Sequence, residues 1–154
     1  MTSKQFARFE GHRILGHRSA VGVFLKYLVD EAEASEHKDE PWLSDAVSHW
    51  RVQASIAEFG ITLEEKWSSA QRQVFIILAE EACKKLATRE SIPAEEVDSW
   101  RLVDGMPISG FGPGVKAPTA PIIELGQALI AVVSGKQPPR GDDWYYGLPP
   151  ARYE

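Results

Sequence analysis

The sequence predicts a mainly α-helical fold, a single-domain bundle of four to five helices with an irregular Gly/Pro-rich loop and an extended C-terminal tail. Apolar residues recur at intervals of three and four in several segments, which is the spacing of one helix face. Residues 105–121 contain eight glycines and prolines and therefore favour irregular chain. Since 154 residues suit one domain, we expect one over 1–154, with a basic N-terminal arm at 1–18 and an aromatic, proline-rich tail at 136–154.

The first helix is expected to begin at Ser19, whose hydroxyl can accept a hydrogen bond from an amide of the first turn. The arm before it has no clear periodicity and fits a short strand or a clasp across the bundle. After the helix, the charged residues 35–40 are expected to form a loop. The apolar face of this helix consists of Val21, Phe24, Leu25, Leu28 and Ala32.

Pro41 predicts the start of the second helix, because proline has no N–H to leave unsatisfied at a first helical position. Its apolar stripe runs from Leu43 through Trp50 to Ala57. Gly60 is expected to end it, since glycine readily adopts the left-handed conformation that follows many helices.

A third, long helix is predicted to begin at Thr62, because Glu65 three residues later completes a capping-box pattern. It would run to about Arg89, and a break near residues 68–69 stays open. Residues 74–78 are apolar on every side, which is typical of a helix surrounded by neighbours. We therefore expect this segment to form the centre of the fold.

Two further helices are expected in the second half of the chain. Pro93 with Glu95 just after it is typical of a helix start, because acidic side chains favour the positive end of the helix dipole. Residues 101–103 fit a short extended piece. The last helix would follow Thr119, carry mostly buried apolar residues and end at Gly135.

The composition argues against several classes of protein. Seventeen Lys and Arg against 22 Asp and Glu give a net charge of −5, which disfavours general nucleic-acid binding. The single Cys83 excludes an internal disulfide and a cysteine-based zinc finger. No apolar run approaches the roughly 18–20 residues of a membrane span, so no membrane partner is expected. The first eleven residues lack the apolar stretch of a secretory signal, so we expect a cytoplasmic protein.

Charge is unevenly distributed along the chain. Residues 1–18 carry four basic side chains against one acidic side chain, whereas residues 19–40 carry six acidic against two basic. The arm and the acidic segment are expected to fold against each other or to meet different partners.

Four histidines raise the question of a metal or catalytic site. Gly-His-Arg occurs twice, around His12 and His17, but five-residue spacing places the two on different faces of a helix or strand. No His-x3-His or His-Glu-x2-His motif occurs, so we expect no metal and no cofactor. Two pairs have the i, i+4 spacing of helix surface neighbours, Asp45 with His49 and Glu33 with His37.

Two other candidate motifs are also weak. Cys83 lies near the apolar face of the long helix and is expected to be a buried small hydrophobe rather than a nucleophile. The glycines of residues 110–116 resemble a phosphate loop, but Lys116 is not followed by Ser or Thr and a helix. We interpret residues 105–118 instead as a lid or a partner-binding surface.

The tail places three large aromatic residues beside two aspartates. These aromatics either fold back over the last helix or form the buried contact of a docking surface. Acidic side chains would raise the rate of association with a basic partner. The predicted partner-binding residues are Glu36, Asp39, Glu40, Asp142, Asp143, Trp144, Tyr145 and Tyr146.

The sequence thus favours a non-enzymatic acidic module that binds another, basic protein. An immunity- or antitoxin-type inhibitor of a basic effector fits this size and charge. A self-associating structural protein, with the tail exchanged between copies, is one alternative. The other is an enzyme with a pocket under the 105–118 loop, built from His12, His17 or His49 with Asp45 or Asp104.

Overall fold

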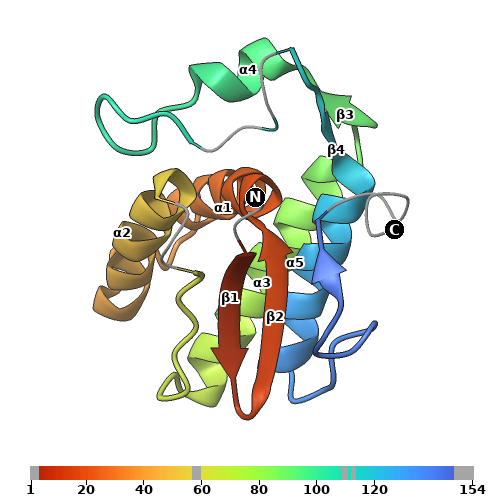
Figure 1. Ribbon diagram of the computed structural model, residues 1–154. Helices are drawn as coiled ribbons and strands as arrows, with labels where there is room; N and C mark the ends of the chain where they lie inside the picture. The colour runs from red at the N-terminus through yellow and green to blue at the C-terminus, as the bar shows by residue number, and fades with distance from the viewer. Residues whose placement is uncertain (1–3, 57–59, 109–110, 112–113, 148–154) are drawn as a thin grey trace.

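The computed structural model describes residues 4–56, 60–108, 111 and 114–147. In these residues the chain forms five helices and two small sheets, so the mainly helical class is confirmed (Figure 1). The helices are α1 (Arg18–Glu33), α2 (Pro41–Ser55), α3 (Ser69–Leu86), α4 (Ala94–Ser99) and α5 (Thr119–Val133). The strands are β1 (Lys4–Phe9), β2 (His12–His17), β3 (Ser91–Ile92), β4 (Ala117–Pro118) and β5 (Tyr145–Tyr146).

The basic N-terminal arm is a β-hairpin, one of the options that the sequence left open. Its two-residue turn has positive φ at Glu10 (49°) and Gly11 (85°), a conformation that matches the right-handed twist of the flanking strands. Ala7, Phe9 and Ile14 are buried. The tail strand β5 pairs in parallel with β2, which gives the order β1-β2-β5 (Figure 1). Residues about 130 positions apart therefore share one sheet.

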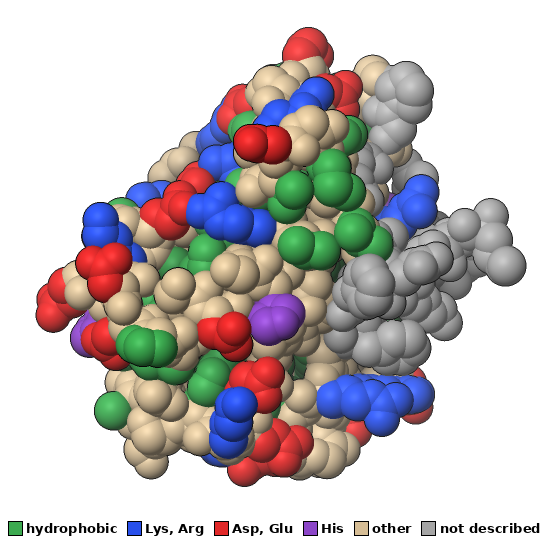
Figure 2. Space-filling model, turned by 90° about the vertical axis from the view of Figure 1, so that its left-hand side faces the viewer, with side chains coloured by type: hydrophobic (Ala, Val, Ile, Leu, Met, Phe, Trp, Pro, Cys, Tyr) green, Lys and Arg blue, Asp and Glu red, His purple; other side chains and the backbone are tan. Residues whose placement is uncertain are grey.

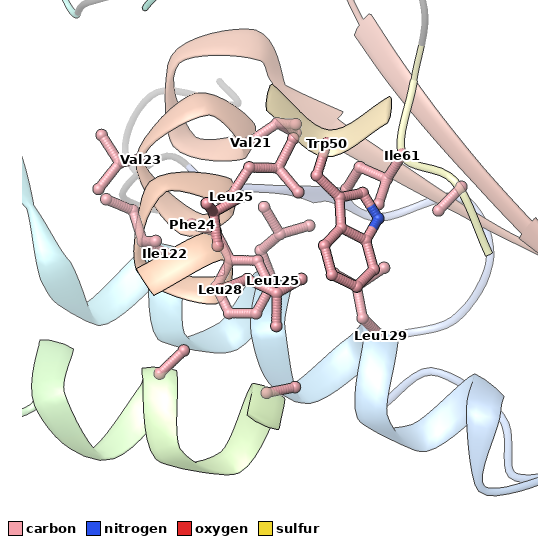
Figure 3. Close-up of a cluster of buried hydrophobic side chains, with 14 of the residues drawn as sticks. Val21, Val23, Phe24, Leu25, Leu28, Trp50, Ile61, Ile122, Leu125 and Leu129 are labelled. Atoms are coloured by element: carbon pink, nitrogen blue, oxygen red, sulfur yellow. The ribbon is translucent and has the colours of Figure 1, made fainter. Parts of the chain in front are cut away.

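Helix α1 is the central element, and the expectation that residues 74–78 would be central is wrong. α1 packs against α2, α3 and α5, whereas Ile77 in α3 is 50% exposed. Figure 3 shows Phe24 and Leu28 of α1 beside Leu125 of α5, with Trp50 of α2 nearby. The helix begins at Arg18, and the side chain of His17, not of Ser19, caps it. The Nδ1 atom of His17 accepts the amide of Ser19 at 3.3 Å.

The connection between α2 and α3 corrects two further expectations. α2 ends at Ser55 rather than at Gly60, and Ala57 lies outside the described residues. Thr62 caps no helix, because the side chain of Gln53 bonds both its amide (3.0 Å) and its hydroxyl (2.7 Å). The capping box is formed six residues later, where Ser68 and Gln71 cap each other's backbone at the start of α3.

The second half of the chain follows the expected order. α4 begins after Pro93, and α5 begins at Thr119 and is followed by Gly135, which has a φ of +85°. The short antiparallel pair of β3 and β4 joins the chain just before α4 to the chain just before α5. Within the expected extended piece at 101–103, Val103 forms an isolated bridge with Met106. Among the described residues, no helix combines the length and apolar character needed to cross a membrane.

Candidate functional site

The acidic residues predicted to bind a partner lie in two separate places. Glu36, Asp39 and Glu40 are exposed on the loop between α1 and α2. Asp142 and Asp143 lie beside the hairpin instead, where His12 Nδ1 is 3.2 Å from an oxygen of Asp142. The structure therefore does not unite the predicted residues in one surface.

Among its described side chains, the basic arm contacts the aspartates of the tail. Arg13 donates to Asp143 at 2.8 Å, and His12 contacts Asp142. These side chains, with Arg8, Gly11 and Glu65, line a polar hollow of about 560 Å³. Asp143 thus already pairs with a cation of its own chain, and Asp142 contacts a histidine of its own chain.

The three tail aromatics also lie in different surroundings. Tyr146 is 1% exposed and its hydroxyl accepts the amide of Arg140 at 2.9 Å, so its ring offers no surface to a partner. The guanidinium of Arg140 lies 4.7 Å from the ring centre of the half-buried Trp144. Tyr145 is half-buried and meets the ring of His17 edge-on. The described part of the tail, which ends at Gly147, therefore packs on its own chain.

A groove with two tryptophans lies next to the acidic loop, on a part of the molecule that sequence reasoning missed. Trp42 and Trp67 meet edge-to-face with ring centres 5.5 Å apart. The groove has a volume of about 520 Å³ and separates the start of α2 from the chain that leads into α3. We call it the tryptophan groove; its lining residues are Pro41, Trp42, Asp45, Ala46, Thr62, Glu64, Lys66, Trp67 and Gln71.

A second groove lies on the other side of the acidic loop. It has a volume of about 340 Å³ and runs between the end of α1 and α3. Its apolar part includes Ile77, one of the few large hydrophobic side chains that are more than a third exposed among the described residues. We call it the α3 groove; its lining residues are Glu31, Ala34, Ser35, Glu36, His37, Val74, Ile77 and Leu78.

Glu40 connects the two grooves through its carboxylate. One oxygen lies 2.5 Å from Nδ1 of His37 in the α3 groove, and the other accepts the indole N–H of Trp42 at 2.9 Å in the tryptophan groove. The hydrogen bond to Glu40 raises the pKa of His37, and the bonds from His37 and Trp42 lower the pKa of Glu40. The acidic loop and the two grooves thus form one surface, which we call the loop–groove surface.

The face that carries α2 has charges of both signs with hydrophobic side chains between them (Figure 2). Pro41 positions this surface, because the helix begins there and Trp42 occupies its first turn. The carboxylate of Glu40, the residue before the helix, bonds no backbone amide of α2 and is instead directed at His37 and Trp42. The sequence signal that could have indicated this site is a tryptophan directly after the proline that begins a helix. The ring that packs against Trp42 is that of Trp67, which lies in a segment that the sequence predicts to be helical.

The side chains proposed for a catalytic site do not converge. His49 is exposed and lies 3.9 Å from Asp45, its neighbour on the same helix. His17 stacks on Phe111, so one described residue of the 105–118 loop does contact it. The spacing of Glu33 and His37 yields no pair, because Glu33 contacts Arg51 and His37 contacts Glu40. In the part of the chain that the structure describes, no three His, Cys, Asp or Glu side chains are arranged to hold a metal ion.

Cys83 has the properties of a packed side chain. Its thiol lies 3.9 Å from the carbonyl oxygen of Ile123 in α5, and burial raises its pKa to about 11. A thiol with this pKa is almost entirely protonated near neutral pH and is a poor nucleophile.

Comparison with protein-family models, with curated proteins and with solved structures finds no match for this chain. A functional argument for this chain therefore starts from the chemistry of its own surfaces.

Proposed function

We propose that this protein is a non-enzymatic module that binds a basic partner protein through the loop–groove surface. The observation that supports this proposal is the position of the exposed acidic loop between two partly apolar grooves, joined by Glu40. Protein interfaces combine a desolvated apolar centre with a polar rim, and this surface offers both. An inhibitor of the immunity or antitoxin type is the kind of module we propose.

Charge supports a basic partner. Glu36, Asp39 and Glu40 are exposed on the loop, and Lys38 is the cation among them. The whole chain has a net charge of −5. Complementary charge steers two proteins together and mainly raises the association rate, whereas apolar anchors slow dissociation.

The proposal is tested by affinity capture from a native lysate at low salt, with the captured proteins identified by mass spectrometry. The loop variant E36Q/D39N/E40Q removes three negative charges from the loop–groove surface. The control variant E95Q/D98N/D104N removes three exposed carboxylates on and after α4.

We expect the intact protein and the control to retain a protein of high isoelectric point. The loop variant is expected to retain it about tenfold less, since removing charges from a steering surface lowers association by roughly this order. Equal retention by the loop variant, or a captured partner that is acidic, would refute the proposed surface.

A further inference from the structure

The five tryptophans of the chain differ in the burial of their rings and in their contacts with cations. Trp50 and Trp67 are buried in the core. Trp100 has the ammonium group of Lys26 over its ring at 5.4 Å, and Trp144 has the guanidinium of Arg140 at 4.7 Å. Trp42 is the remaining tryptophan; it is half-buried, and none of the described cations lies over its ring.

Arg140 and Lys26, which lie over these tryptophan rings, are each also paired with a carboxylate. Arg140 donates to Glu124 at 2.9 Å while it covers Trp144. Lys26 pairs with Asp30 at 2.5 Å while it lies over Trp100. Arg72 is held in the same way, 4.7 Å from the ring centre of Phe9 and 3.3 Å from Glu10, so an aromatic face and a carboxylate together hold a cation at three places among the described residues, as expected from the attraction of a cation to both groups.

The tryptophan groove presents the same two groups, an aromatic ring and carboxylates, and no described cation lies over the ring of Trp42. Asp45 and Glu64 line it together with the ring of Trp42, and the side chain of Asp45 is 74% exposed. The indole N–H of Trp42 donates to Glu40, which helps to fix the ring in the lining of a space of about 520 Å³. Lys66 is exposed at the same groove, so its lining carries two carboxylates against one ammonium group.

We infer that the tryptophan groove binds an arginine side chain of a basic protein segment, with the guanidinium over Trp42 and paired with Asp45 or Glu64. This inference rests on the proposed function and names the chemistry of its partner. Arginine fits better than lysine, because its planar guanidinium stacks on an aromatic face while its N–H groups pair with a carboxylate. Lysine carries a compact, strongly hydrated charge that gains less from the ring.

The test uses capped hexa-arginine as the probe, with hexa-lysine and hexa-citrulline as matched peptides, in isothermal titration calorimetry at low salt. The groove variants are W42A and D45N/E64Q. The control variant E95Q/D98N removes the same number of charges from α4, and the circular dichroism of every variant is compared with that of the intact protein.

We expect hexa-arginine to bind the intact protein and the control about equally, and W42A and D45N/E64Q about five- to tenfold more weakly. Hexa-lysine should bind the intact protein more weakly than hexa-arginine, and hexa-citrulline should not bind. If W42A does not fold, the NMR signal of the Trp42 indole N–H in the intact protein tests whether hexa-arginine binds at this ring. This NMR signal should shift on addition of hexa-arginine. An unshifted signal, or equal weakening by the α4 control, would overturn the inference.

The two proposals fail in different ways. If the acidic loop is needed to capture a basic protein but the groove variants bind hexa-arginine normally, the arginine site is wrong and the proposed function stands. If hexa-arginine shifts the NMR signal of Trp42 but no basic protein is captured, the proposed function is wrong, whereas the preference of the groove for arginine stands.

Discussion

Replacing Gly147 with alanine tests whether the aromatic tail is part of the fold. Gly147 follows β5 and has a φ of +103°, a conformation that L-residues rarely adopt. A Cβ added there would lie 2.5 Å from Cβ of Ala20 in α1, which is closer than real Cβ atoms approach. The tail can therefore pass over the start of α1 only because this position has no side chain.

The loss of stability expected for G147A has two contributions. Backbone strain at positive φ costs roughly 1–3 kcal/mol, and overpacking of a close contact costs roughly 1–3 kcal/mol more. We expect G147A to lower the free energy of unfolding by about 2–6 kcal/mol, a large share of the roughly 5–15 kcal/mol of a typical domain. G141A is the matched control, since Gly141 has a φ of +85° but open space around its Cβ position, so it should cost about 1 kcal/mol.

Urea unfolding followed by circular dichroism gives these free energies, and hydrogen exchange of the peptide covering residues 141–147 reports on the tail itself. Adding A20G to G147A removes the Cβ of Ala20, the atom that the new alanine side chain would contact too closely. The double variant should therefore recover part of the overpacking cost. If G147A and G141A have the same stability within about 0.5 kcal/mol, and tail protection is unchanged, the tail does not pack on α1 as described.

Three further outcomes are expected. S68A should cost about 1 kcal/mol in urea unfolding, because the hydroxyl of Ser68 accepts the amide of Gln71 at the start of α3. A thiol reagent at pH 8 should modify Cys83 slowly in the folded protein and rapidly in urea, since burial raises its pKa to about 11. An NMR titration should give His37 a pKa above its usual 6.5, which E40Q should lower. The contact between His37 and Glu40 is expected to stabilise the fold where His37 is charged and Glu40 is ionised. This stabilisation is lost as the pH rises through the raised pKa of His37, and also as the pH falls through the lowered pKa of Glu40.

Most helices could be predicted because their signals are local. Pro41 and Pro93 mark helix starts whichever neighbours surround them, and the apolar face of α1 is visible as a spacing in the sequence. The error at Thr62 shows where local reasoning fails. Its capping pattern was present, but Gln53 of α2 provides the hydrogen bonds instead, and a distant partner is not visible in a sequence window.

The candidate site could be predicted only in part. The exposed acidic loop with Glu36 and Glu40 was evident from its charge. The pairing of Trp42 with Trp67 was not evident from the sequence. Trp42 lies in α2 and Trp67 lies in the chain before α3, and only the packing of the fold brings these two segments together. Tyr146 was assigned to the surface because a sequence cannot distinguish an aromatic residue that docks on a partner from one buried in its own fold.

The sequence by itself determined the helical class, the order of the helices, the acidic loop and the lack of a recognisable catalytic motif. These depend on spacing, turn residues and charge within short stretches of chain. Only the tertiary structure decided that α1 is central, that the tail forms a third strand beside the hairpin, and that Trp42 lies in a groove with Asp45 and Glu64. Those features arise from long-range packing, in which each side chain is buried or exposed according to neighbours that lie far away along the chain.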